Sequence, residues 1–288
     1  MSNRRRRRLL PMLSPHSPAH LISLLVFLFS GVCWSTTIVV VTTKDRIVLA
    51  SDSKEVSIGS IVYGPKSVNK IVVLNDTTAI AVTGLSKCNI AANGKVVFQY
   101  DTDRIVDQIK DSFSSNASIS VIEGIIVNKM KASMNRLVPY LRDGAVDPKQ
   151  AAKGPSFVDF IIVGYKSGVP VTDRVTINFD WNLRKISGPI VSSENSSPDR
   201  PHQVCFTGCN AIDQLRVPNS PEQLAAFSRY PDAIKGLTFR GLNSSNALNA
   251  AADLVRLECE FDPKFVGLPI HIVTLTRDKK PVITTLAK

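Results

Sequence analysis

The alternation of strand patterns and helical patterns along the chain is the feature that most constrains its fold. Runs rich in β-branched and apolar residues, typical of strands, occupy residues 36–84, 157–208 and 269–287. Apolar residues at helical spacing lie between them, at 103–141 and 221–260. Because groups of strands alternate with groups of helices, and single βαβ units are absent from the pattern, we predict an α+β fold built from packed layers.

Two details of these patterns sharpen the expected architecture. The runs "TTIVVVTT" (36–43) and "RIVLASD" (46–52) flank Lys44 and Asp45 and predict an N-terminal hairpin. Many strands are apolar on both faces, which is typical of sheets covered by helices on one side and by a second sheet on the other. Within the helical groups we expect separate helices, at 103–113, 118–141, 221–230 and 244–260, the last of which opens with a Ser/Asn cap.

The size and charge of the chain argue for an ordinary globular protein. Its 288 residues suffice for a large core, and 44% hydrophobic with 20% charged residues is unlike a disordered chain. The formal net charge is +11, but Arg4–Arg8 supply five of the positive charges. Residues 36–288 carry 30 basic and 24 acidic residues, with no clustered basic stripe. We therefore expect no nucleic-acid partner.

The first 35 residues have the three zones of a secretory signal peptide. A basic block is followed by an apolar run at 21–34, and the small residues Cys33 and Ser35 precede a predicted cleavage after Ser35. The apolar run is shorter than a typical membrane span of about 20 residues. We therefore divide the chain into a signal peptide or propeptide (1–35) and one domain (36–288), secreted or periplasmic. An uncleaved membrane anchor at 21–34 and a start codon placed too far upstream are the alternatives.

The cysteines and histidines of residues 36–288 do not suggest a metal site. Two histidines, His202 and His271, and no C-x-x-C pair are present. We expect neither a metal nor a cofactor. Four cysteines permit two disulfides in an oxidising compartment, and the three ways of pairing them remain open: Cys88, Cys205, Cys209 and Cys259.

The segment "TTIVVVTTKDRIVLASDSK" resembles the mature N-terminus of proteasome β subunits and of the related bacterial HslV protease. In that family a threonine comes first and an aspartate follows sixteen residues later, the separation of Thr36 and Asp52. "SVNKIVVL" is similar to the family segment that carries a lysine and places this lysine at Lys70, with two more residues after the aspartate than usual. "AIAVTG" resembles the segment that ends in two glycines and matches Gly84 to the first, whereas Leu85 replaces the second.

Two weaker matches lie further along the chain. "VCFTGCNA" resembles a family G-S-G element, with Cys209 at the place of the serine. "EFDPKFVGLP" occupies the place of an aspartate, a serine and two glycines, which matches Asp262 to the aspartate and leaves the serine without a counterpart. The detailed resemblance covers residues 36–84, and over the remaining chain it extends to the order of elements.

The resemblance implies the fold and chemistry of an N-terminal-nucleophile (Ntn) hydrolase, a four-layer αββα sandwich. It implies that Thr36, once freed at its N-terminus, is the nucleophile and that its own α-amine serves as the base. Lys70 would lower the pKa of this amine, Asp52 would hold Lys70 in place, and the Gly84 N–H would stabilise the oxyanion. Cys209 and Asp262 would support the site.

We therefore predict a threonine-type amide hydrolase acting on peptides, which can assemble into a homo-oligomer or ring. A threonine in a β-branched run is usually plain strand surface, so the prediction depends on the spacing to Asp52 and on the signal-like segment that ends before Thr36. One alternative is the same fold acting on a non-peptide amide. The other is a non-catalytic relative held by a membrane anchor, in which Thr36 has no free amine.

Overall fold

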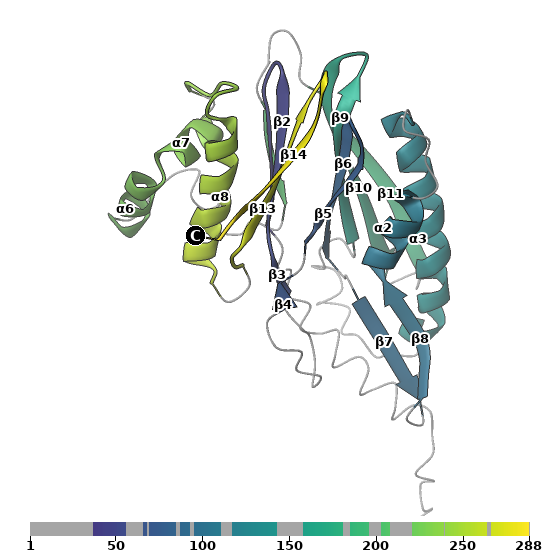
Figure 1. The fold of residues 1–288 in the computed structure, drawn as a ribbon. Helices are drawn as coiled ribbons and strands as arrows, with labels where there is room; N and C mark the ends of the chain where they lie inside the picture. Colours follow the sequence, from purple (N-terminus) through teal and green to yellow (C-terminus); the bar gives the residue numbers. More distant parts are fainter. Residues whose placement is uncertain are drawn as a thin grey trace, which may run out of the picture.

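The computed structural model describes residues 37–55, 66–67, 69–84, 87–92, 95–110, 117–142, 158–180, 185–195, 203–207, 221–238, 240–263 and 266–287. These residues form a mixed α/β structure with two antiparallel sheets of five strands each (Figure 1). The strands of the first sheet lie in the order β12 (Gln203–Thr207), β1 (Ile38–Thr42), β2 (Arg46–Asp52), β13 (Ile270–Thr276) and β14 (Lys279–Leu286).

The second sheet combines strands from the first half of the chain with strands from the middle. Its order is β11 (Lys185–Asn195), β10 (Val169–Asp180), β9 (Val158–Lys166), β6 (Thr78–Gly84) and β5 (Ile71–Asn75). Two short antiparallel pairs lie beside the sheets: β3 (Lys54–Glu55) with β4 (Lys66–Ser67), and β7 (Lys87–Ala92) with β8 (Lys95–Asp101).

The described helices lie on the outer faces of the two sheets, and the inner faces of the sheets meet (Figure 1). On the outer face of the second sheet are α2 (Thr102–Lys110) and α3 (Ile119–Arg142). On the side of the first sheet are α6 (Pro221–Arg229), α7 (Pro231–Thr238) and α8 (Ala247–Phe261). Helices therefore pack against each of the two antiparallel sheets.

The N-terminal hairpin confirms the prediction from the β-branched runs. β1 and β2 pair antiparallel, with Ile38 opposite Ser51 and Thr42 opposite Ile47. Alternation along β2 then places its side chains on two faces. Val48 packs against the helix side, and Leu49 packs toward the second sheet. The hairpin is thus apolar on both faces because each face is covered.

Three apolar clusters hold the layers together. One joins α8 to the first sheet and includes Val39, Val48 and Leu254. A second joins α2 and α3 to the outer face of the second sheet. The third lies between the sheets and is built from side chains of both: Ile38, Val40, Ile47, Leu49, Ile71, Ala79, Ala81, Ile161, Val163, Val273 and Leu275.

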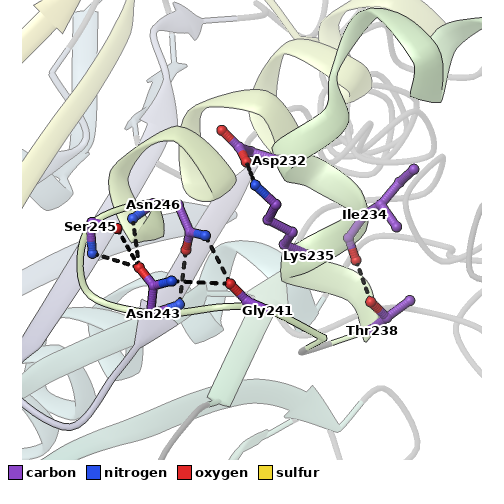
Figure 2. Close-up of polar contacts among 8 residues, drawn as sticks. All are labelled: Asp232, Ile234, Lys235, Thr238, Gly241, Asn243, Ser245 and Asn246. Carbon is purple, nitrogen blue, oxygen red and sulfur yellow. Dashed lines mark hydrogen bonds and ion pairs between the residues drawn. The ribbon is translucent and has the colours of Figure 1, made fainter.

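Helix α8 begins at Ala247, three residues later than predicted, because the Ser/Asn segment before it forms a hydrogen-bonded turn (Figure 2). The Asn243 side chain accepts a bond from the Ser245 N–H at 2.9 Å. The Asn246 side chain accepts from the Asn243 N–H at 2.9 Å and donates to the Gly241 carbonyl at 2.9 Å. Asn246 occupies the N-cap position, but its side chain makes no capping bond to α8 and instead bonds within the turn before the helix.

The structure also corrects the sequence analysis. Helix α7 and the β7–β8 pair were not predicted, and strand β11, within the strand-like region 157–208, was not predicted as a separate strand because its last residues belong to a Ser/Asn/Pro-rich stretch typical of loops; β10 is longer than its apolar core suggests. Residues 59–65, which belong to the strand-like region 36–84, lie outside the described residues. None of the described helices is both long and apolar enough to cross a membrane. The segment 21–34, where an anchor was considered, is likewise outside them.

Candidate functional site

Asp52 and Lys70 form a buried ion pair where the two sheets meet. Asp52 is the last residue of β2, and Lys70 directly precedes β5 in the opposite sheet. The Lys70 Nζ lies 2.9 Å from Asp52 Oδ1, and the two side chains are 9% and 0% exposed. Lys70 Nζ also donates to the Lys54 carbonyl at 2.8 Å. Two predicted site residues from different sheets are therefore in direct contact.

Backbone N–H groups surround the Asp52 carboxylate. The N–H of Thr37 donates to Oδ1 at 2.8 Å, and that of Lys54 donates to Oδ2 at 3.0 Å. The N–H of Gly267 approaches Oδ2 at 3.4 Å. A buried carboxylate is stable only when such donors replace water. The Asp52 carboxylate therefore accepts hydrogen bonds from three separate segments: the start of β1, the segment after β2 and the loop before β13.

The protonation of Asp52 depends on these neighbours. Burial raises the pKa of the Asp52 carboxyl above its usual range, and the Lys70 ammonium and the backbone donors act against this shift. Lys70 is first among the groups that favour the charged carboxylate. Lys70 is therefore the neighbour that most strongly opposes protonation of the buried Asp52 carboxylate.

Gly84 closes strand β6 beside this pair. It has a φ of 100°, in the region that favours glycine, and it lies opposite Val158 of β9. The strand is joined to the ion pair through the backbone, because the Val82 N–H donates to the Lys70 carbonyl at 3.2 Å. Gly84 follows two residues later, so the structure brings it to the same end of the sheets as Asp52 and Lys70.

Asp262 begins the loop between α8 and β13, and Gly267 of this loop contacts Asp52. It caps the C-terminus of α8, where its N–H donates to the Glu258 carbonyl at 2.8 Å. Its own carbonyl accepts from the Val266 N–H at 2.9 Å, and the next residue, Gly267, is the one that contacts Asp52. The structure therefore places Asp262 in a segment that supports Asp52.

The other two predicted site residues, Thr36 and Cys209, lie outside the described residues. Thr37 is described, and it follows Thr36 directly in the chain. Its backbone N–H is the group that bonds to Asp52. The contact of Asp52 thus involves the peptide nitrogen immediately after the predicted nucleophile.

Two residues near the ion pair were not predicted as part of a site. His271 of β13 lies opposite Ser51 of β2 and Thr285 of β14, and its Nδ1 is 3.3 Å from the Thr285 hydroxyl. Burial and then the charge of Lys70 lower the pKa of His271. The sequence did not mark His271 as a site residue, because a single histidine within a strand pattern does not by itself indicate a functional site.

Cys259 of α8 is the second unpredicted neighbour. Burial raises the pKa of its thiol to about 12, and the charges of Asp52 and Glu258 add to the shift. A thiol with this pKa stays protonated near neutral pH and is a poor nucleophile. It is free, so the two disulfides that four cysteines would permit are not both formed.

The surface between the sheets changes from apolar to polar at this end, which we call the Asp52 end. It is the end where β2 finishes at Asp52, β5 begins at Ile71 and β6 finishes at Gly84, at the bottom of both sheets in Figure 1. Ser51 and Ser53 are fully buried here, and their hydroxyls have no hydrogen-bond partner in the structure. Within the described ranges, no group of three or more His, Cys, Asp or Glu side chains could hold a metal ion.

Comparison with known families finds a match over the N-terminal part of the chain. Residues 34–87 match the family model described as "Proteasome subunit". The matched segment includes the hairpin, the Asp52–Lys70 pair and Gly84. No curated protein matches the chain.

Proposed function

We propose that this protein is a proteasome-like Ntn hydrolase that cleaves amide bonds, with peptides as substrates and Thr36 as nucleophile. The observation that carries the proposal is the contact between Asp52, Lys70 and the backbone N–H of Thr37. It connects a buried lysine with the residue that directly follows Thr36. The match of residues 34–87 to the proteasome family supports the same assignment.

The proposed chemistry begins with cleavage after Ser35, which gives Thr36 a free α-amine. An α-amine has an ordinary pKa of about 7.7–8.0, so a large fraction is neutral near pH 7. The neutral amine accepts the proton of the Thr36 hydroxyl while the oxygen attacks the substrate carbonyl. Lys70 beside it lowers the pKa of the amine by repulsion between like charges, and Asp52 keeps Lys70 charged and in position.

The remaining steps are those of an acyl transfer from the substrate to Thr36 and then to water. The carbonyl carbon gains a bond to the threonine oxygen, and the departing amine takes a proton from the threonine α-ammonium. Water then attacks the ester carbon, the bond from this carbon to the threonine oxygen breaks, the acyl group leaves as a carboxylic acid, and the threonine oxygen regains a proton as the free hydroxyl. Gly84 is proposed to offer its N–H to the oxyanion, a contribution of about 3 kcal/mol in known cases. Asp262 and Cys209 are proposed as supporting residues.

The proposed fold is the four-layer αββα sandwich of Ntn hydrolases. The described helices lie outside two facing sheets, which supports this architecture. Strand β1 turns Val39 and Val41 toward α8, and Ile38 and Val40 toward the second sheet. The proposal requires β1 to extend by two residues, since alternation would then turn Thr36 toward the sheet that supplies Lys70 and Gly84.

Export and assembly belong to the same proposal. A signal peptidase cut after Ser35 would deliver the protein to the periplasm or the exterior and free the Thr36 amine in one step. Self-association into a homo-oligomer agrees with the family match. It also agrees with the exposed apolar side chains of the edge strand β14, Val282 and Ile283, which are 58% and 63% exposed.

A covalent probe tests this function. A β-lactone acylates a nucleophilic hydroxyl, and we expect one adduct on purified mature protein, located by peptide mass spectrometry at Thr36. Protein that still carries residues 1–35 serves as the control and should remain unlabelled, because its Thr36 nitrogen is an amide. Labelling at another residue, or equal labelling of both forms, would refute Thr36 as an N-terminal nucleophile.

A further inference from the structure

A second ion pair, between the buried Asp159 and the more exposed Arg174, faces the space between the sheets at the Asp52 end. Along β9, Val158 and Phe160 pack against the α2–α3 side, whereas Ile161 and Val163 face the first sheet. Asp159 shares the face of Ile161 by alternation. In β10, Val175 and Ile177 face the helices, so Arg174 and Thr176 face the first sheet as well. None of these polar residues was predicted from the sequence.

The members of this pair are firmly bonded. Arg174 Nη2 lies 2.8 Å from Asp159 Oδ2, and the Thr176 hydroxyl donates to Asp159 Oδ1 at 2.6 Å. Thr83 of β6, next to Gly84, is the cross-strand neighbour of Asp159. Its hydroxyl is buried and has no hydrogen-bond partner in the structure. The row Thr83–Asp159–Thr176 therefore extends the polar surface from Gly84 across two further strands.

In both ion pairs at this end, the cation is more exposed to solvent than the carboxylate. In each, the carboxylate is hidden and the cation is the more exposed partner. Asp52 is 0% exposed beside Lys70 at 9%, and Asp159 is 2% exposed beside Arg174 at 37%. A cation that reaches the surface of a site while its counter-ion lies behind it leaves a positive potential in front. Such a surface favours an anionic group on the molecule that binds there.

We propose that Arg174, held in place by Asp159, binds a carboxylate of the substrate and makes this enzyme prefer acidic peptides. This inference rests on the proposed function, because it places the carboxylate on the same molecule as the amide that is cleaved. A guanidinium presents N–H donors in a planar fork that matches a carboxylate, so arginine distinguishes this group from a neutral amide. Neighbouring strands lie about 4.8 Å apart. Arg174 is two strands from Gly84 and would contact a residue near the cleaved bond, not the bond itself.

The carboxylate could come from an acidic side chain or from the free C-terminus of a peptide, and the test separates these sources. One set of peptides carries glutamate, glutamine or lysine at one of three positions before the cleaved amide. A second set has the same neutral sequence and ends in either a carboxylate or an amide. We expect mature protein to cleave the best acidic peptide about tenfold faster in kcat/KM than its glutamine counterpart, with lysine slowest.

Variants then assign this preference to Arg174. Arg174→Gln alone would leave Asp159 unpaired, so the decisive variant is the double substitution Asp159→Asn with Arg174→Gln. Its ratio of kcat/KM for glutamate over glutamine should fall toward one, and Arg174→Lys should keep part of the preference. The matched control is Arg256→Gln, because Arg256 forms a similar ion pair with Asp253 at 3.0 Å on α8. This control should keep the full preference.

The outcomes separate the inference from the function on which it rests. Equal cleavage of acidic and neutral peptides, or an unchanged ratio in the double variant, would refute the role of Arg174 while β-lactone labelling of Thr36 upheld the hydrolase. If no peptide is cleaved and no label forms, both proposals fail. Thermal unfolding of each variant shows whether a lost preference reflects lost structure.

Discussion

Replacing Thr36 by alanine should abolish amide hydrolysis, by about 10⁴-fold or more, without unfolding the protein. Alanine removes the hydroxyl that attacks the carbonyl, and no other described group near the ion pair is an obvious substitute. The Cys259 thiol has a pKa of about 12 and stays protonated. Peptide hydrolysis by the purified mature variant measures the loss, and circular dichroism checks the fold.

The neighbouring threonine supplies the matched control. Thr37→Val removes a buried hydroxyl that has no hydrogen-bond partner in the structure, and it keeps the backbone N–H that Asp52 accepts. This variant should retain most of its activity, and Thr36→Ser should retain part of it. Loss of activity in Thr37→Val with full activity in Thr36→Ala would show that the two threonines had been assigned the wrong way round.

Replacing Lys70 by methionine should reduce both stability and activity. The substitution leaves the Asp52 carboxylate buried without its counter-ion, and breaking such a pair typically costs about 3–5 kcal/mol in the free energy of unfolding. Activity should fall at least about 10²-fold, because nothing then lowers the pKa of the Thr36 amine. Urea unfolding and peptide hydrolysis measure the two effects.

Two further variants separate the structural effect from the catalytic one. Lys235→Met breaks a partly exposed surface pair with Asp232, in which Lys235 Nζ lies 2.6 Å from Asp232 Oδ1 (Figure 2). It should cost less than about 1 kcal/mol and leave activity intact. The double variant Asp52→Asn with Lys70→Met removes both buried charges and should regain stability but not activity. A double variant as active as the native protein would exclude the pair from catalysis.

Local patterns predicted those parts of the fold whose structure depends on nearby residues. The β-branched runs around Lys44 and Asp45 form the expected hairpin because both of its faces are buried. Strand β11 was missed because Gly188 and Pro189 interrupt it, and it forms at a sheet edge, where proline is tolerated, by pairing with β10. Helix α7 has only eight residues and starts at Pro231, so its pattern is too short to recognise.

In the candidate site, too, the sequence predicted only what depends on residues close together in the chain. Asp52 and Lys70 could be predicted because both lie in the segment that resembles a known family, and the structure brings their charges together. Asp159 and Arg174 could not, because their position depends on which strands become neighbours. Alternation gives the face of each strand, but only the sheet order places this pair and Gly84 at one end. Likewise, His271 gains its place beside Ser51 from the pairing of β2 with β13.

The central claim is that a cut after Ser35 creates the active N-terminus. N-terminal sequencing and intact-mass measurement of the protein, produced in a host that exports it, test this directly. We predict a chain that begins with Thr36, and the Thr36→Ala variant should be cut at the same place, because a signal peptidase reads the residues before the cut. A mature chain that begins at Met1, or at any residue other than Thr36, would contradict the account.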